Sequence, residues 1–293
     1  YGIENVETGD VKTFKEEKEF FAHFGLHWIP PEVRENLGEI EKAQEEINLI
    51  ELNDIRGDLH MHSTWSDGAQ SIREMAEQAK QTGYEFIAIT DHSKYLRVAN
   101  GLNEERLRKQ RKEIDKINEE KKNFHIFAGI EMDILPDGSL DFDDDFLQEM
   151  DFVIASIHSS FTQSQDKIMT RLLNAMENPY VHMIAHPTGR LIGRRKGYSV
   201  DLDTLIEKAE QTGTILELNA NPNRLDMNWE TLIKAQEAGV HIAINTDAHN
   251  YSMLDHMRIG VGAARKGWLR KENVINTWKK EDLLNLFQGK ARK

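Results

Sequence analysis

The chain has 293 residues and contains no cysteine. Disulfide bonds and thiolate metal ligands are therefore excluded, so any bound metal must be held by nitrogen and oxygen atoms. A chain without thiols fits a reducing compartment, and we expect a cytoplasmic location. Long apolar runs are also missing, because no run approaches the roughly 18 residues that cross a bilayer. We expect no membrane partner.

Cationic side chains are in the minority, with 37 Lys and Arg against 50 Asp and Glu and a formal net charge of −13. This balance argues against an extensive surface for polyanions. Bound divalent cations would reverse the local sign at their site, however, and one segment is itself basic. The segment HPTGRLIGRRKGY carries Arg190, Arg194, Arg195 and Lys196 with no acid between them. We expect its arginines to contact phosphate, and a merely solvated basic loop is the alternative.

Seven apolar runs have the length of β-strands, and amphipathic segments separate them. This alternation is typical of parallel sheets with helical crossovers, and it predicts an α/β fold with a seven-stranded (β/α)7 barrel. The strand-like runs are Ile55–His62, Phe86–His92, His125–Glu131, Phe152–His158, His182–His186, Ile215–Asn221 and His241–His249. The helical patterns are Ala69–Thr82, Glu104–Lys121, Asp166–Glu177, Asp201–Thr212, Trp229–Ala238 and Asp255–Lys266, with a short crossover near Asp143–Met150.

Residues 1–50 differ from this pattern. They combine an apolar stretch, FFAHFGLHWIPPEV, with the charged run Glu39–Glu51, which has helical spacing. Pro30 and Pro31 break any helix between the two, because proline lacks a backbone donor. We predict a short N-terminal appendage, made of a docking segment and a linker helix, before a domain of residues 51–293.

Nine side chains that can bind metal stand at the downstream ends of six of the strand-like runs. In a parallel barrel these ends converge on one mouth, so ligands far apart in sequence become neighbours. Six imidazoles and three carboxylates exceed the four ligands of one tetrahedral ion, which predicts two or three divalent metal ions per chain with shared carboxylates. The nine residues are His60, His62, Asp67, His92, Glu131, His158, His186, Asp247 and His249.

A histidine at a strand end is often only a hydrogen-bonded loop residue, and the chain supplies its own control for that alternative. His125, His182 and His241 stand at strand starts, at the opposite end of the barrel, and we interpret them as structural. The nine downstream residues share one end of the barrel, and chance explains this poorly. The sequence therefore favours a metal site, with Glu131 as the bridging carboxylate because it is the only glutamate of the set.

Strand alternation also predicts which residues lie beside the ligands. Asp58 shares a face with His60 and His62, so it could orient a ligand histidine, and a buried ion pair or loop hydrogen bond is the alternative. Asp91 is expected to point away from His92 and to serve a structural role. Asn245 shares a face with the ligands that follow it.

On the strand-like run without a ligand, Glu217, Asn219 and Asn221 share a face, and Arg224 follows in the loop. Two interpretations stay open: these side chains recognise substrate, or they fill the barrel interior with polar groups. Lys94 directly follows the motif of His92 and could reach a phosphate, with solvent as the alternative. We predict Lys94, Asn219 and Arg224 as substrate-binding residues, together with the basic loop.

The motifs HMHSTWSDG, ITDH, AGIE, SIH, AHP and TDAH occur in this order, and with them the chain resembles the PHP (polymerase and histidinol phosphatase) family of metal-dependent phosphoesterases. The resemblance covers residues 55–293, and all nine family ligand positions are filled. It implies a distorted seven-stranded barrel and phosphoester hydrolysis. It also implies manganese as the metal, with zinc or iron as alternatives, and Glu131, His158 and Asp247 as catalytic ligands.

The flanking segments GLHWIPPEVREN, ELNDIRGDLHMHSTWSDG and LELNANPNRLDMNW resemble the C-terminal part of bacterial and archaeal family X DNA polymerases. Residues 1–50 then correspond to the end of a polymerase thumb plus a linker. The resemblance implies 3′–5′ exonuclease activity in DNA repair, with abasic-site incision or 3′-phosphate removal in some members. DNA with 3′ ends or gaps and an upstream polymerase domain are the implied partners.

Two other functions stay open at this stage. A small-molecule phosphatase of the histidinol-phosphate type would share both the metals and the fold. A catalytically silent scaffold for a polymerase would keep the fold and lose the ligands, and the complete ligand set argues against it. The nucleotidyl-transfer core is not in these residues, so polymerase activity is not assigned to them.

Overall fold

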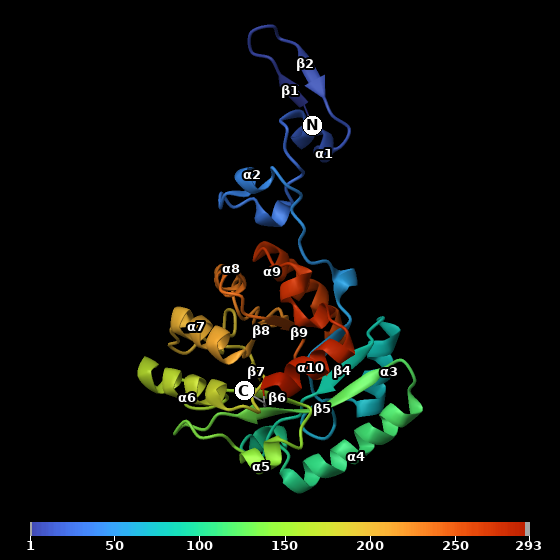
Figure 1. Cartoon of the computed structure of the whole chain (residues 1–293), viewed down its shortest axis with the longest axis vertical. Coiled ribbons are helices and arrows are strands. Elements are labelled where there is room, and N and C mark those ends of the chain that lie inside the picture. The colour runs from blue at the N-terminus through green and yellow to red at the C-terminus, as the bar shows by residue number, and fades with distance from the viewer. Residues whose placement is uncertain (1, 291–293) are drawn as a thin grey trace. The chain divides into compact units, whose positions relative to one another are not determined.

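The computed structural model of the chain describes residues 2–290, and it separates into two compact units, Tyr1–Leu49 and Ile50–Lys293 (Figure 1). The division falls one residue before the predicted boundary. None of the helices within residues 2–290 is both long and apolar enough to span a bilayer.

The larger unit is built on seven parallel strands that pair in sequence order, β3-β4-β5-β6-β7-β8-β9. Helices connect successive strands, as Figure 1 shows, so the predicted α/β barrel with seven strands is confirmed. The strands are β3 (Gly57–Met61), β4 (Phe86–Ile89), β5 (His125–Asp133), β6 (Phe152–Ser156), β7 (Met183–Ile184), β8 (Ile215–Asn219) and β9 (Ile242–Asn245).

The barrel closes between its first and last strands through an irregular seam. Next to the mouth, Met61 forms a parallel bridge with Ala248. Further down, Asn276 takes the place of direct pairing: its side-chain amide donates to the carbonyls of Gly57 and Ile244 at 3.0 and 2.7 Å, and its Oδ1 accepts the Ile244 N–H at 2.7 Å. A buried asparagine thus satisfies backbone groups that the two strands leave unpaired along this seam.

The helices of this unit cover the outer face of the sheet with their apolar sides. Side-chain caps start several of them: Ser71, for example, accepts the Glu74 N–H and forms a capping box with that residue. The six predicted long helices are present with small shifts of their ends. The helices are α3 (Ile72–Gln81), α4 (Glu104–Glu120), α5 (Asp144–Leu147), α6 (Gln165–Glu177), α7 (Leu202–Thr212), α8 (Trp229–Glu237), α9 (Met257–Lys266) and α10 (Lys280–Lys290).

The final helix, α10, is an element that the sequence pattern did not predict. Its Leu283 and Phe287 are buried in a second apolar cluster with residues of the strands. The Phe287 ring lies 4.6 Å from the ring of Phe152 and 5.7 Å from that of Phe127, measured between centroids. The barrel interior is therefore apolar near α10. Along β8 the side chains change from Ile215, in this cluster, to polar residues toward the mouth.

The smaller unit contains an antiparallel hairpin of β1 (Gly2–Glu4) and β2 (Val11–Thr13), followed by α1 (Glu17–His23) and α2 (Glu39–Lys42). The predicted linker helix over Glu39–Glu51 is wrong beyond Lys42, where the helix ends. Most side chains of this run are exposed. A longer helix here would have no apolar face to pack against the protein, which explains why the helix does not continue beyond Lys42.

Candidate metal centre

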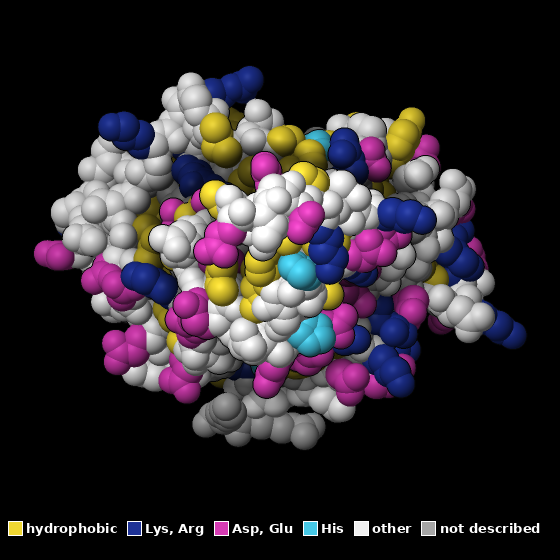
Figure 2. All heavy atoms as spheres, turned by 90° about the horizontal axis from the view of Figure 1, so that it is seen from above, with side chains coloured by type: hydrophobic (Ala, Val, Ile, Leu, Met, Phe, Trp, Pro, Cys, Tyr) yellow, Lys and Arg dark blue, Asp and Glu magenta, His cyan; other side chains and the backbone are white. Residues whose placement is uncertain are grey.

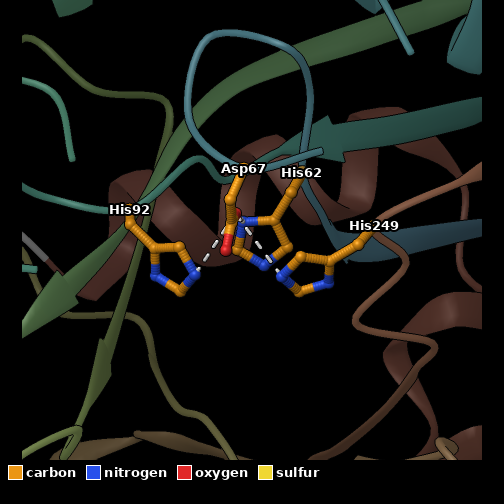
Figure 3. A group of neighbouring side chains, drawn as sticks. All are labelled: His62, Asp67, His92 and His249. Carbon is orange, nitrogen blue, oxygen red and sulfur yellow. Dashed lines mark ion pairs between the residues drawn. The ribbon is translucent and has the colours of Figure 1, made fainter. Parts of the chain in front are cut away.

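The predicted ligands lie together where the strands of the barrel end. In the first group, the imidazoles of His62, His92 and His249 surround the carboxylate of Asp67 (Figure 3). The Asp67 Oδ1 lies 3.5 Å from His249 Nε2, 3.7 Å from His92 Nε2 and 3.9 Å from His62 Nδ1. These residues come from the ends of three strands and one loop, so only the closed barrel brings them together.

A second group lies deeper and consists of His60, His62, Glu131 and Asp247, all of them buried. His60 Nε2 is 3.3 Å from Glu131 Oε2 and 3.5 Å from Asp247 Oδ1. His62 Nε2 faces the same two oxygens at 3.5 and 3.1 Å. His62 belongs to both groups, and its two ring nitrogens point to different carboxylates.

Glu131 links the second group to a third, which contains His92, Glu131 and His158. Its Oε2 lies 3.0 Å from His92 Nδ1, whereas its Oε1 lies 3.2 Å from His158 Nε2 and 2.9 Å from His186 Nε2. His186 is outside the three groups but contacts their shared carboxylate. The two oxygens of Glu131 therefore face different histidines, as a bridging ligand requires.

The donor set fits divalent cations on two grounds. His60 Nε2, His62 Nδ1, His92 Nδ1 and Glu131 Oε2 are fully buried and have no hydrogen-bond partner within the described structure. Unsatisfied buried polar atoms are costly, so a convergent set of them marks the place of a missing partner. Imidazole nitrogens mixed with carboxylate oxygens suit zinc, manganese or iron, and the absence of cysteine excludes a thiolate site.

The pKa shifts in the centre show how strongly its charges interact. Burial raises the pKa of Glu131, but His158, His60 and His92 together outweigh it and hold that pKa well below its usual range. Burial lowers the pKa of His158, yet the carboxylates of Glu131 and Asp133 together outweigh this and raise it to about 10. By contrast, burial together with neighbouring His249 and His92 lowers the pKa of His62 to about 3. Anionic oxygens and a neutral imidazole are the forms that bind cations.

Glu217 on β8 forms hydrogen bonds with two of the predicted ligands, His60 and His186. Its Oε1 accepts from His60 Nδ1 at 2.8 Å and from the Asn245 side-chain amide at 3.0 Å. Its Oε2 accepts the His186 backbone N–H at 2.7 Å and lies 3.3 Å from the Asn219 amide. A histidine that donates from Nδ1 presents the lone pair of Nε2 to the centre. Of the two open interpretations of this strand, the contacts favour a polar interior that supports the ligands.

Of the two interpretations of Asp58 that the sequence left open, the contacts favour a buried hydrogen-bonding role over the orientation of a ligand ring. Its carboxylate accepts the backbone N–H of His60 at 3.2 Å and bonds the backbone and hydroxyl of Thr246, rather than an imidazole ring. The irregular register of β3 between Asp58 and Met61 breaks the simple alternation. The structural role of Asp91 is confirmed, since it accepts from the backbone and hydroxyl of Ser63.

Asp133 is a buried neighbour of the centre that the sequence analysis did not single out. Its Oδ2 lies 3.4 Å from His158 Nδ1, on the side of the ring opposite Glu131. Asp133 follows Glu131 by two residues, so strand alternation alone could have identified it. His182, predicted to be structural, is buried at the other end of the barrel, where its Nδ1 accepts the Val153 N–H at 3.0 Å.

Two of the predicted ligands stand in left-handed backbone conformations, His186 with φ 30° and Asp247 with φ 52°. Residues other than glycine rarely adopt positive φ, and such strain tends to gather at functional sites. Both residues come just after short, buried strands, which turn sharply into their loops. The turn directs the two side chains toward the centre.

The predicted substrate-binding cations differ in how close they lie to the centre. Arg224 is the nearest, with Nε 3.5 Å from Asp247 Oδ2 and a buried Nη1 that has no hydrogen-bond partner. Arg190 donates to the carbonyls of Arg224 and Leu225 and so fixes the loop that carries Arg224.

The other three cations have different surroundings. Arg195 donates to the Gly189 carbonyl and lies 4.0 Å from the Phe161 ring centroid, and Arg194 is exposed. Lys94 forms an ion pair with Glu104 at 2.5 Å, so its positive charge is already balanced by a carboxylate of the protein. On the face that Figure 2 displays, acidic and basic side chains are interspersed without a continuous basic area.

Sequence comparison identifies relatives of both units of the chain. The sequence model of the DNA polymerase beta thumb matches residues 1–35. DNA polymerase/3′-5′ exonuclease PolX of Bacillus subtilis is 62% identical over 283 residues, which is 97% of this chain and 50% of that protein. The chain thus spans about half the length of this relative. A probable phosphatase of Thermoanaerobacter sp. is 27% identical over 75% of this chain and 89% of its own length.

Among solved structures, histidinol phosphate phosphatase of Lactococcus lactis, complexed with zinc, L-histidinol and phosphate, superposes with a TM-score of 0.52. It covers 71% of this chain and 93% of its own, at 20% identity, which establishes a shared fold. The sequence model of the PHP domain matches residues 58–221, more than half of the chain and most of the strands that carry the ligands. The chain belongs to the PHP domain family.

Proposed function

We propose that the larger unit is a metal-dependent phosphoesterase that acts on DNA as a 3′–5′ exonuclease. The observation that carries the proposal is the shared carboxylate of Glu131 between overlapping ligand groups, with the guanidinium of Arg224 beside them. The choice of DNA rests on the 62% identity to PolX, a protein named for polymerase and exonuclease activities. The 20% identity to the histidinol phosphate phosphatase supports only the fold.

The nine predicted residues would hold two or three divalent ions, and we propose manganese, with zinc or iron as alternatives. Ions of this kind polarise a phosphoryl oxygen and lower the pKa of water to about 7. The protein orients the ligands: Glu217 fixes the ring of His60, and Asp133 lies behind His158. Glu131, His158 and Asp247 are the ligands on which we expect hydrolysis to depend most.

The cations at the mouth would place the DNA. Arg224 lies beside Asp247, and its unpartnered Nη1 can donate to a phosphate oxygen that approaches the centre. Arg190 and Arg195 hold the backbone of the surrounding loops, and exposed Arg194 is free of such a contact in the described structure. The side-chain amide of Asn219 donates a hydrogen bond to Asp247 Oδ2 at 3.2 Å and so helps to fix that carboxylate.

The thumb match over residues 1–35 supports a polymerase domain in the same protein as a partner. DNA with 3′ ends or gaps would be the substrate during repair. We also propose a cytoplasmic location, which the lack of cysteine supports.

The deciding experiment follows one DNA oligonucleotide, labelled at its 3′ end or at its 5′ end, during incubation with the purified chain. Stepwise shortening from the 3′ end that requires manganese is the expected result. Asp247→Ala and His158→Ala should abolish shortening, and circular dichroism should show that both variants remain folded. Intact DNA combined with release of phosphate from histidinol phosphate would refute the proposal in favour of a small-molecule phosphatase.

A further inference from the structure

The mouth of the barrel carries a set of exposed apolar side chains that the proposed chemistry does not use. Within described residues 50–290, five large hydrophobic side chains are exposed, and four of these stand in loops that leave the ligand-bearing ends of strands. We call these four the apolar rim. Its members are Tyr95, Val98, Ile192 and Tyr251, with exposed fractions of 41%, 95%, 50% and 49%.

The rim residues are close in sequence to the ligands. Tyr95 follows His92 by three residues, and Tyr251 follows His249 by two. The fifth exposed side chain, Leu52, precedes β3 and therefore belongs to the opposite end of the barrel. Single exposed hydrophobic residues need no explanation. Four of these five, however, lie at the ligand-bearing end of the barrel, and exposed apolar side chains that gather at one end are typical of interaction surfaces.

Hydrogen bonds anchor the backbone of the rim, while its side chains stay about half exposed or, for Val98, almost fully exposed. Tyr95 N–H donates to Asp141 at 2.7 Å, and Tyr251 N–H donates to Gln70 at 3.2 Å. Ile192 N–H donates to the carbonyl of Asn223, the neighbour of Arg224, at 2.6 Å. Fixed loops present the exposed side chains in a defined place, which lowers the entropic cost of binding.

Other aromatic residues near the ligands are not available in this way. Trp65 donates its indole N–H to Glu113 at 2.9 Å, and the Phe161 ring is covered by Arg195 and stacked with Tyr198. The partly exposed phenol rings of Tyr95 and Tyr251 are therefore the aromatic rings that a ligand can contact at this end of the barrel.

We propose that the apolar rim, through Tyr95 and Tyr251, binds nucleobases of the DNA strand whose phosphate enters the metal centre. The inference rests on the proposed function and adds a subsite to it. The centre and Arg224 recognise only a phosphate, which every phosphoester shares, whereas exposed aromatic rings stack on bases of any sequence. The rim would therefore distinguish a nucleic acid from a small phosphate ester.

The test compares two oligonucleotides of equal length: a thymidine strand, and the same strand with tetrahydrofuran in place of the last three nucleosides. The Tyr95→Ala, Tyr251→Ala double variant should raise KM for the first by on the order of 10-fold and leave KM for the second unchanged. The corresponding phenylalanine variants should retain wild-type KM, because they keep the ring. Leu52→Ala is the matched control for loss of an exposed side chain.

Equal KM values for wild type and double variant on the thymidine strand would overturn the inference, as would equal changes on both strands. Anisotropy of a labelled oligonucleotide in EDTA separates this inference from the proposed function. If the chain hydrolyses no DNA but still binds the oligonucleotide in a way that depends on the two tyrosines, the exonuclease proposal is refuted and the base-binding role of the rim stands. A changed sedimentation coefficient with unchanged DNA binding would identify the rim as a contact between copies instead, and would refute the inference.

Discussion

Replacing Glu217 with glutamine tests how the polar interior of the barrel supports the metal centre. The carboxylate accepts four hydrogen bonds: His60 Nδ1 and the Asn245 amide on one oxygen, the His186 N–H and the Asn219 amide on the other. Glutamine keeps one of these oxygens and turns the other into a donor. The backbone N–H of His186 cannot change its role, so we expect the amide oxygen of Gln to stay with it.

The new amide then faces His60 and Asn245. His60 can respond by changing tautomer, so that Nδ1 accepts and Nε2 carries the proton. Nε2, which now lies 3.3 Å from Glu131, would no longer offer a lone pair to a cation. The Asn245 amide loses its oxygen acceptor and keeps only the weak contact to Met183 Sδ at 3.6 Å, which costs about 1 to 3 kcal/mol for a buried donor. Loss of a partner that orients a metal ligand lowers metal affinity by roughly 10- to 100-fold.

Two measurements check this prediction. Urea unfolding in EDTA should show a loss of about 1 to 3 kcal/mol for Glu217→Gln, and calorimetric titration with manganese should show weaker binding. The control is Glu149→Gln, whose carboxylate pairs with Arg108 on the surface, and which should change stability by less than about 1 kcal/mol. Unchanged manganese affinity together with unchanged stability would refute the orienting role of Glu217.

Three further predictions concern other parts of the barrel. Burial lowers the pKa of His182 to about 3, below its usual 6.5, so the unfolded chain binds the proton more readily and stability falls as pH drops below 6.5. The loss at pH 5 should be about 2 kcal/mol, and urea unfolding of His182→Asn, which can still accept the Val153 N–H, should show a smaller loss. Asn276→Ala should lower unfolding free energy by at least about 2 kcal/mol through the unpaired backbone of the seam, and a midpoint like that of wild type would contradict the closing role. Arg224→Ala should raise KM for DNA about 10-fold or more, and initial rates that stay at wild-type values would show that phosphate is held elsewhere.

Much of the metal centre was accessible from the sequence, because strand periodicity and the ends of strands are local properties. His60 and His62 project together through alternation, and a parallel barrel brings every strand end to one mouth. Eight of the nine predicted ligands accordingly fall into the three groups, and His186 contacts the carboxylate that two of them share. The number of strands followed from the regular alternation of apolar and amphipathic runs.

Tertiary structure decided the contacts that depend on register between distant strands. Glu217 meets His60 across 157 positions in sequence, and Asn276 closes the seam against a strand 219 positions earlier. The irregular register of β3 directed Asp58 to backbone groups instead of a ring. Sequence alone therefore determined which side chains could bind metal and at which end of the barrel. Register and closure, which arise only when all strands pack together, determined which groups orient those ligands.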